Sequence, residues 1–238
     1  MLAALSRKFG IAKKAAILLS GCGVYDGSEI HESVSIIMHL SRAGIQYQCF
    51  SINRSVPAVN HASGTPAEGL RNMLEESARI ARGDVKSISE MKPEAYDALF
   101  IPGGFGIAKN FSNFASAGDK MEVDPEVAKA VWEFFHAKKP IGACCIAPVI
   151  LAKIFGTVSG KSGLDVTLGK KGAEWPYAGS IEVANKFGNK LVDCDIDDIC
   201  KDRFNNVVTT PAYMRETAKP HEVFDGIKKM VDEVISYI

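Results

Sequence analysis

Two adjacent cysteines, Cys144 and Cys145, lie in the segment KKPIGACCIAPVIL, where a short apolar run meets a turn of small residues. The residue between the end of a strand and the first turn of the next helix is held above the edge of the sheet. Unpaired N–H groups and the positive end of the helix dipole favour a thiolate at that place. Cys145 occupies it and is the candidate nucleophile, whereas Cys144 is expected to pack as a small apolar side chain. The alternative is that both are ordinary core cysteines.

The chain contains six cysteines, which in principle permit three disulfides. A chain of this length can build a sufficient core without them, and the neighbours Cys144 and Cys145 are a poor pair for a normal bridge. The sequence has no C-x-x-C pair and no Cys/His group with zinc spacing. We therefore expect free thiols in a reducing compartment, no metal site and no cofactor.

The 238 residues are 47% hydrophobic and 24% charged, with 28 Lys and Arg against 28 Asp and Glu. This composition can bury a sizeable core, and a formal net charge of zero provides no overall field that would attract nucleic acid or an anionic membrane. No apolar stretch has the length of a membrane span. Residues 1–13 are interpreted as a basic tail, either the end of a transit peptide or a plain extension, and residues 14–238 as one domain.

Short apolar runs that end at Gly or Pro alternate with helical patterns along the chain. The predicted strands span residues 15–20, 46–52, 96–101, 141–144, 165–169, 191–194 and 206–210. The predicted helices span residues 29–43 with Ser28 as N-cap, 65–82, 125 to about 139, 146 onward, 179–187 and 220–237. A turn is expected at residues 203–205.

This alternation predicts an α/β fold in which a parallel sheet lies between layers of helices, a three-layer sandwich. In such folds ligands bind beyond the carboxyl ends of the strands. Three unusual segments are expected there: the glycine-rich loop of residues 21–28, the Pro102-Gly103-Gly104 turn and the double cysteine.

Several segments are similar to one protein family. Residues 145–148 (CIAP) resemble the cysteine elbow of the ThiJ/PfpI superfamily, which has a flavodoxin-like, class I glutamine amidotransferase-like fold. Longer segments resemble its ElbB subgroup, the bacterial enhancing lycopene biosynthesis (isoprenoid biosynthesis glyoxalase) proteins and their mitochondrial counterparts. Those segments are SGCGVYDGSEIHE (20–32), IPGGFGIAKNFSNFA (101–115), GACCIAP (142–148), WPYAG (175–179) and VVTTPAYM (207–214). The similarity extends from about residue 14 to the C-terminus.

The resemblance implies that Glu32 is the first-helix glutamate that hydrogen-bonds the cysteine, so Cys145 and Glu32 are the expected catalytic pair. A carboxyl group beside a thiolate must be protonated, because like charges repel and burial raises its pKa further. A neutral Glu32 can donate to the thiolate and then transfer protons. Glu29, one turn earlier, is the local competitor for this role.

By the same resemblance, the N–H groups of Gly104 and Ile146 form an oxyanion-binding site, with Gly103 beside them. The plainer interpretation of these glycines is a tight turn. The Trp175-Pro176-Tyr177 loop is expected either to cover the pocket or to meet a partner subunit. Three more residues are expected to line the pocket: His31, Tyr25 and Thr210.

The histidines depart from a related pattern. Class I glutamine amidotransferases complete a triad with a late H-x-E motif, which this chain lacks. A Cys–His dyad would need a distant histidine such as His61, because none occurs between Pro148 and His221. Glutamine hydrolysis is therefore not expected, and any catalysis depends on Cys145 and Glu32.

The resemblance implies a cofactor-independent cysteine enzyme with glyoxalase activity, even if weak, that converts methylglyoxal or glyoxal to a 2-hydroxy acid. The alternative is a non-catalytic redox-sensing or interaction protein with an oxidisable Cys145. The expected partners are a small carbonyl substrate and a second copy of the chain in a homodimer, with no nucleic acid and no membrane. The expected location is cytoplasmic in a bacterium and the mitochondrial matrix in a eukaryote.

Overall fold

The computed structural model describes residues 13–238. The predicted basic tail, residues 1–13, lies outside the described residues except for Lys13. That lysine forms an exposed ion pair with Asp97, 3.2 Å from Nζ to Oδ1, next to the start of the first strand.

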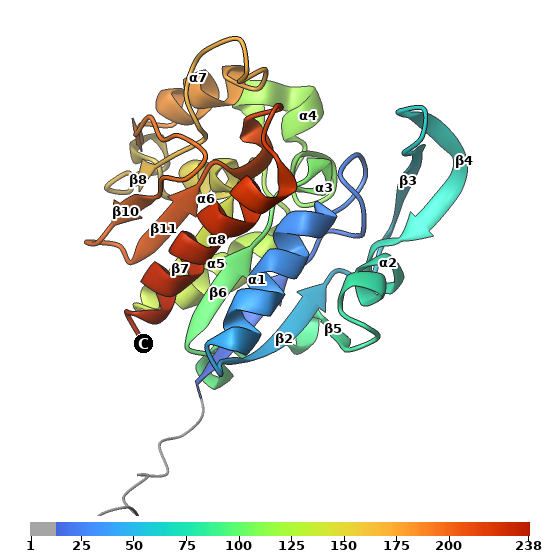
Figure 1. The fold of residues 1–238 in the computed structure, drawn as a ribbon, viewed down its shortest axis with the longest axis horizontal. Helices are drawn as coiled ribbons and strands as arrows, with labels where there is room; N and C mark the ends of the chain where they lie inside the picture. Colours follow the sequence, from blue (N-terminus) through green and yellow to red (C-terminus); the bar gives the residue numbers. More distant parts are fainter. Residues whose placement is uncertain (1–12) are drawn as a thin grey trace, which may run out of the picture.

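A seven-stranded sheet runs through the molecule in the order β10-β11-β7-β6-β1-β2-β5 (Figure 1). Neighbouring strands are parallel except β10 and β11, which pair antiparallel at one edge. The central strands β6 and β7 are buried at every position, which explains their short, continuous apolar sequences. The seven strands are β1 (Lys14–Leu18), β2 (Gln46–Ser51), β5 (Val85–Ser87), β6 (Ala98–Ile101), β7 (Ile141–Cys144), β10 (Cys200–Asp202) and β11 (Val207–Thr210).

Helices cover both faces of this sheet (Figure 1). On the face toward the viewer, α1 (Ile30–Arg42) and α8 (Pro220–Ile235) lie side by side, and α5 (Pro125–His136) and α6 (Pro148–Phe155) lie behind the sheet. α2 (Met73–Ile80) packs against β2 and β5. These three layers confirm the predicted α/β sandwich with a mostly parallel sheet.

Shorter elements complete the chain between the main layers. They are α3 (Phe105–Lys109), α4 (Phe114–Ala117), α7 (Gly179–Lys186), the strand pair β8 (Asp165–Val166) and β9 (Lys190–Leu191), and the 3-10 helices η1 (Ile88–Glu90), η2 (Pro93–Ala95), η3 (Gly118–Lys120), η4 (Thr157–Ser159) and η5 (Ala212–Met214). Two of them, α3 and η5, follow β6 and β11 and so lie at the carboxyl ends of the sheet.

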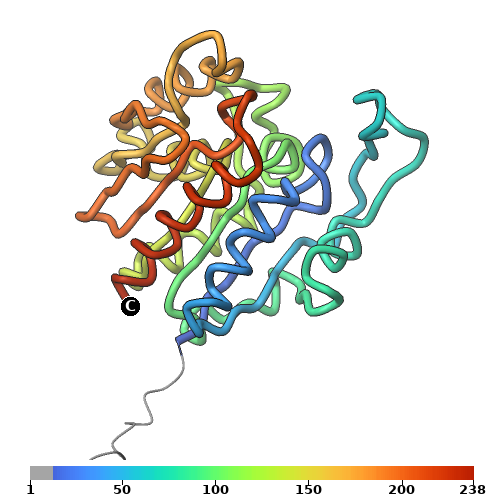
Figure 2. The backbone as a smooth tube through the Cα atoms, in the orientation of Figure 1, coloured from blue at the N-terminus to red at the C-terminus, as the bar shows by residue number. Residues whose placement is uncertain are grey.

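A two-stranded hairpin, β3 (Ser55–Asn60) and β4 (Thr65–Asn72), extends away from the sheet beside α2 (Figure 2). The helix predicted over residues 65–82 is therefore wrong in its first half. Pro66 and Gly69 give the physical reason, because both disfavour a helix interior and Gly69 has a φ of 85°. α2 starts only after Asn72, whose side chain accepts from the N–H groups of Leu74 and Glu75.

The start of α1 also differs from the prediction. Its N-cap is Glu29, whose carboxylate accepts from the N–H of Glu32 at 2.7 Å, and not Ser28. The hydroxyl oxygen of Ser28 instead accepts from the N–H of Ser20 at 2.9 Å. This hydrogen bond ties the loop after β1 to the end of that strand.

The remaining predicted elements are present with shifted ends. α6 begins at Pro148 and not at residue 146, because the backbone of Cys145 is left-handed and cannot belong to the helix. The strands predicted at 165–169 and 191–194 are only two residues each, β8 and β9. β5 and β10 were not predicted, since each has only three residues and neither forms a continuous apolar run.

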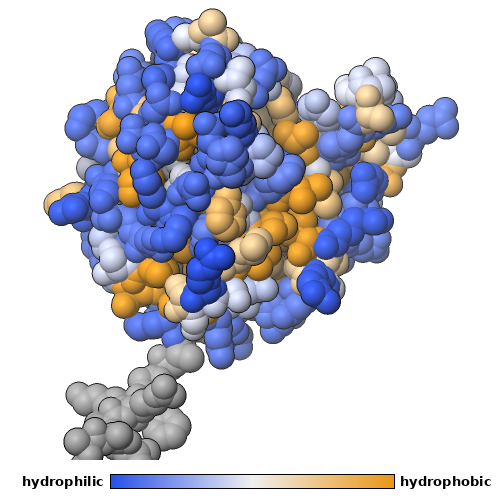
Figure 3. Space-filling model, viewed as in Figure 1, coloured by the Kyte–Doolittle hydropathy of each residue, from blue (hydrophilic) through white to orange (hydrophobic). Residues whose placement is uncertain are grey.

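The face shown in Figure 3 is mostly hydrophilic, with apolar side chains gathered over α1. Ile30 and Met38 of this helix are 45% and 46% exposed. No helix within residues 13–238 is both long and apolar enough to cross a lipid bilayer. Ile30 and Met38 therefore contribute exposed apolar surface on the amphipathic helix α1.

Candidate active site

Three loops meet at the carboxyl ends of neighbouring strands. They follow β1, β6 and β7, which lie side by side in the sheet order β7-β6-β1, and each leads into a helix. The first loop leads to Glu32 on α1, the second contains Gly103 and Gly104, and the third contains Cys145. Parallel pairing therefore brings together residues that are far apart in the sequence, at the edge where the sequence predicted a site.

Cys145 is held in an unusual backbone conformation between β7 and α6. Its φ is 58°, a left-handed value that is uncommon for a residue other than glycine. Its N–H donates to the carbonyl oxygen of Thr210 at 3.0 Å, so the neighbouring strand β11 fixes the turn. The residue is 8% exposed, in contrast to Cys144, which is fully buried as the sequence predicted.

Glu32 is completely buried, and its carboxyl group faces the cysteines. Its Oε2 accepts from the N–H of Gly103 at 2.8 Å and from the thiol of Cys144 at 3.6 Å, and its Oε1 accepts from the N–H of Tyr213 at 3.4 Å. The thiol of Cys145 lies near the same carboxyl group and lowers its pKa. The glutamate predicted by resemblance is thus in contact with the predicted cysteine, and Glu29 is not.

Gly103 separates these two side chains and can only be glycine. A β-carbon placed on it would overlap the Cβ of Cys145 and would lie 2.8 Å from Oε2 of Glu32 and 2.9 Å from Sγ of Cys145. The absence of a side chain therefore allows the thiol and the carboxyl group to approach each other.

The pKa of Glu32 is raised to about 8, mainly by burial and then by the negative charge of Glu29. Hydrogen bonds from Cys145, Gly103 and Tyr213 oppose this rise without cancelling it. The carboxyl group is therefore neutral at pH 7, the state required beside an ionised thiol.

Burial raises the pKa of the Cys145 thiol well above its usual range, and the charge of Glu32 raises it further. This corrects the expectation of a thiol ionised by the helix N-terminus. The N–H groups of Gly104 and Ile146 do lower its pKa by donating to the sulfur, but burial outweighs them. The same cause raises the pKa of Cys144 well above its usual range, followed by the charge of Glu32.

The backbone donors divide into two sets. Those of Gly104 and Ile146 lie near the sulfur of Cys145 and lower its pKa, while that of Gly103 donates to Glu32. Gly104 has a φ of 98°, and a β-carbon on it would lie 2.5 Å from the N of Glu29, so this turn too requires glycine. Of the three residues expected at the oxyanion site, Gly104 and Ile146 have N–H groups at the sulfur, and Gly103 positions the acid.

Aromatic side chains form the rim above this group. Phe105 contacts Tyr25 and Tyr177, with ring centroids 6.5 Å and 5.9 Å apart. Burial raises the pKa of Tyr177, and the charges of Glu216 and Cys145 raise it further. On the other side, the His31 ring meets Tyr213 edge-on at 5.9 Å. The sequence predicted Tyr25 and His31 here but missed Phe105 and Tyr213, which are ordinary aromatic positions in the sequence.

Thr210 does not line the site with its side chain. It is fully buried, and its hydroxyl donates to the carbonyl oxygen of Asp198 at 3.0 Å. Only its backbone carbonyl takes part, by accepting from Cys145.

His61, the distant histidine considered for a dyad, is used elsewhere. Its Nε2 accepts from the N–H of Tyr25 at 3.2 Å, and its Nδ1 lies 3.1 Å from the carbonyl oxygen of Val59, to which it can donate. It therefore links the tip of the β3–β4 hairpin to the loop after β1, and both its nitrogens are occupied.

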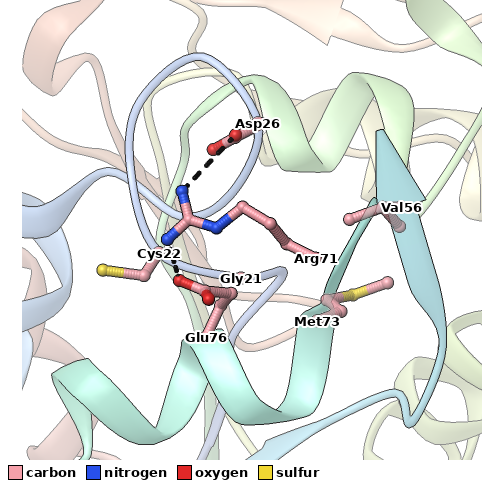
Figure 4. A pocket seen from close by; sticks show the side chains of 7 residues that line it. All are labelled: Gly21, Cys22, Asp26, Val56, Arg71, Met73 and Glu76. Atoms are coloured by element: carbon pink, nitrogen blue, oxygen red, sulfur yellow. Dashed lines mark hydrogen bonds and ion pairs between the residues drawn. The ribbon is translucent and has the colours of Figure 1, made fainter. Parts of the chain in front are cut away.

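A separate small hollow lies under the hairpin (Figure 4). The guanidinium group of Arg71 points between Asp26 and Glu76, forming ion pairs with both, and the thiol of Cys22 lies beside them. The cavity volume is about 10 Å³, roughly one water molecule. Arg71 pairs with both acids, and Arg79 pairs with Glu76 as well at 2.9 Å, so these ion pairs fasten the hairpin to the loop after β1 and to α2. It is lined by Gly21, Cys22, Asp26, Val56, Arg71, Met73 and Glu76.

Within residues 13–238, no group of three or more His, Cys, Asp or Glu side chains is arranged to hold a metal ion.

The chain is 45% identical over 229 residues to the human "Glutamine amidotransferase-like class 1 domain-containing protein 3, mitochondrial", covering 94% of this chain and 83% of that protein. It is 44% identical over 227 residues to the rat "ES1 protein homolog, mitochondrial", covering 93% and 83%.

One solved structure is similar to this chain in both fold and sequence. The isoprenoid biosynthesis protein with amidotransferase-like domain from Ehrlichia chaffeensis superposes with a TM-score of 0.85 and 37% identity, covering 95% of this chain and 99% of that one. The sequence model of the DJ-1/PfpI family matches residues 14–175, a range that contains Glu32, Gly103, Gly104 and Cys145. The matched range and these relatives establish that the chain belongs to the DJ-1/PfpI family.

Proposed function

We propose that this chain is a cofactor-independent glyoxalase that converts methylglyoxal or glyoxal to the corresponding 2-hydroxy acid. One observation carries the proposal: the thiol of Cys145 and the carboxyl group of Glu32 meet at Gly103, where an added β-carbon would lie 2.9 Å from Sγ and 2.8 Å from Oε2. The N–H groups of Gly104 and Ile146 lower the pKa of the same thiol. A thiol, a proton-transfer group and two fixed donors are the parts needed to add to an aldehyde and rearrange it.

The first step uses the form of the pair that has lost one proton. Glu32 has the lower pKa of the two, about 8, so it is the group that loses this proton. As a carboxylate it takes the proton of the Cys145 thiol, which gives a thiolate on Cys145 and a neutral Glu32. The thiolate attacks the aldehyde carbon, the carbonyl π bond breaks, and the N–H groups of Gly104 and Ile146 hold the oxyanion.

The next steps transfer protons and return the enzyme to its starting state. Glu32 gives its proton to the oxyanion, forming a hemithioacetal, and becomes a carboxylate. That carboxylate removes the proton from the former aldehyde carbon and delivers it to the neighbouring carbon. The hemithioacetal hydroxyl passes its proton to the neighbouring oxygen, which leaves a 2-hydroxy thioester on Cys145. Water then cleaves the thioester and releases the 2-hydroxy acid and the thiol. Overall, one dicarbonyl and one water give one acid, with no external oxidant or reductant.

The first prediction concerns turnover. Purified protein incubated with methylglyoxal should form lactate, measured directly by chromatography. Cys145→Ser should lower kcat/KM at least about 100-fold, and Glu32→Gln by about 100-fold or more, because each removes a group from the proton-transfer steps. Cys22→Ser is the matched control, since this half-buried thiol lies in the hollow under the hairpin. Lactate formation that persists in Cys145→Ser would remove the thiol from the mechanism.

An oxidation-sensing role is the second candidate, favoured by the same donors. The N–H groups of Gly104 and Ile146 would also hold the oxygens of a sulfenate or sulfinate on Cys145, and Glu32 would donate to them. The raised pKa of the thiol opposes this role, because the thiolate is the form that reacts with peroxide.

The second prediction separates the two candidates. Under the sensing hypothesis, brief exposure to peroxide should oxidise Cys145 several-fold more than Cys49 or Cys200, as measured by peptide mass spectrometry. The latter two thiols are buried, and burial raises the pKa of each to about 12. Equal oxidation of all three would exclude a dedicated sensor while leaving the glyoxalase proposal intact.

The names of the relatives bear on location and on the reaction. The human and rat proteins are described as mitochondrial, which supports the mitochondrial matrix for this chain if its source is a eukaryote. The human name also refers to glutamine amidotransferase, but this chain lacks the H-x-E motif, so we do not propose glutamine hydrolysis. The homodimer stays a prediction.

A further inference from the structure

Glu29 connects the start of α1 to the loop that carries the backbone donors. Its N–H donates to the carbonyl oxygen of Gly103 at 3.0 Å, and its own carbonyl accepts from the N–H and hydroxyl of Ser33 at 3.1 Å and 2.6 Å. Its Oε2 accepts from the N–H of Glu32 at 2.7 Å. One residue thus fixes the backbone on both sides of the contact between Glu32 and Gly103.

The side chain of Glu29 also places a charge beside the buried acid. It is only 9% exposed, and its Oε1 lies 2.9 Å from Nδ1 of His31, whose side chain is 59% exposed. After burial, the charge of Glu29 is the largest cause of the raised pKa of Glu32. The titratable groups that face the two glutamates from α1, from the turn after β7 and from η5 are His31, Cys144, Cys145 and Tyr213.

We propose that Glu29 is a positioning residue for the Glu32–Cys145 pair. Its N-cap contacts hold Glu32 against Gly103, and its negative charge keeps the shared proton on the pair. This role rests on the pair being the reactive centre of the proposed function, but it involves no substrate and can be tested without one. His31 lies on the solvent side of Glu29 and partly offsets that charge whenever its imidazole is protonated.

The third prediction therefore uses the reactivity of the thiol. Iodoacetamide alkylates thiolates, and the rate at Cys145 can be followed against pH by peptide mass spectrometry. The wild-type rate should rise only above neutral pH, because burial and the charge of Glu32 raise the pKa of the Cys145 thiol. Glu29→Gln keeps an oxygen for the N-cap but removes the charge, so the midpoint should fall by about one pH unit, with alkylation at pH 7 about tenfold faster.

Three other variants complete this experiment. Glu29→Asp retains the charge and should keep a midpoint near the wild-type value. Asp124→Asn removes the N-cap carboxylate of α5, which accepts from the N–H of Glu126 at 2.9 Å, and should leave the midpoint unchanged. His31→Lys lies at an exposed position, so it should fold even if Glu29→Gln does not, and its permanent positive charge should lower the midpoint by a few tenths of a pH unit.

The outcomes distinguish this proposal from a plain capping role. A lowered melting temperature with an unchanged alkylation midpoint in Glu29→Gln and in His31→Lys would reduce Glu29 to a helix cap and overturn the proposal. Absence of lactate formation would contradict the glyoxalase reaction without affecting the alkylation result, so the two failures can be told apart.

Discussion

Burial decides the protonation of the groups at the site. Cys145 has two backbone donors at its sulfur, which favour the thiolate, yet its pKa is raised because the thiol is 8% exposed and faces Glu32. Glu32 shows the same balance, since three hydrogen bonds do not offset complete burial. The effect of burial on both pKa values thus outweighs the effect of the nearby N–H groups. The pair must lose one proton before either group can react.

The fourth prediction follows from the burial of Glu32. Its pKa is about 8 in the folded protein against 4.5 as its ordinary value, so the folded state binds the proton more tightly. The associated stability is fully present below about pH 4.5 and is lost as pH rises through about 8. Between pH 5 and pH 9, the wild-type free energy of unfolding should therefore fall by about 4 kcal/mol more than that of Glu32→Gln.

Urea unfolding at pH 5, 7 and 9 measures this difference directly. Glu94→Gln is the control, because Glu94 is exposed and its substitution should leave the pH dependence of the wild type in place. A parallel fall in Glu32→Gln and the wild type would mean that Glu32 is not the buried acid described above.

Among the elements, the turn after β6 has the strictest requirement. It must bring Gly103 between Cys145 and Glu32 and must leave the N–H of Gly104 free to face the sulfur. The carbonyl oxygen of Gly103 is held by the N–H of Glu29, so this turn and the start of α1 form one unit. The Pro102-Gly103-Gly104 sequence is therefore a packing requirement of the site and not merely a tight turn.

The fifth prediction tests this requirement. Gly103→Ala should lower the free energy of unfolding by about 3 kcal/mol, because the new β-carbon overlaps Cys145 and lies within 2.8 Å of Glu32. It should also abolish turnover by separating the pair. Gly179→Ala is the matched control: a β-carbon there meets no atom within 4 Å, so stability should change by less than about 0.5 kcal/mol. Thermal unfolding of both variants gives the comparison, and equal stabilities would contradict the crowding at Gly103.

The sequence predicted the elements that carry strong local signals. β7 was placed at residues 141–144 as observed, and Asp124-Pro125 marked the start of α5, because burial on both faces and a capped first turn leave clear patterns. The hairpin β3–β4 was missed, since its residues are mostly exposed and its Glu and Ala content is typical of helices. β4 is formed by pairing with β3, which no local pattern of residues 65–72 indicates.

The site was predictable to the level of residue identity but not of protonation. Resemblance identified Glu32, Gly104 and Cys145, which the structure brings together. The side-chain direction of Thr210 depends on Asp198, and the contact of Tyr213 with Glu32 depends on the position of η5. These are tertiary relations, and so is the degree of burial that raises the pKa of Cys145.

At the scale of the whole molecule, the site is assembled from distant parts of the chain. Glu32 and Cys144 are in contact although 112 positions separate them, because β1, β6 and β7 are neighbours in the sheet. The loop after β1 is held from the other side by His61 and Arg71 of the hairpin. The site therefore exists only when the central strands have paired, and it cannot form in either half of the chain alone.

All six cysteines are free, and five of them are buried by the same packing that forms the sheet and its helices. A thiol reagent that is too large to enter the native interior would thus modify Cys22 first and reach Cys49, Cys144, Cys194 and Cys200 only as the chain opens. Modification of these four buried thiols, which lie between β2 and β10, would therefore measure unfolding of the protein. Oxidative damage to them would accumulate mainly in molecules that have already unfolded.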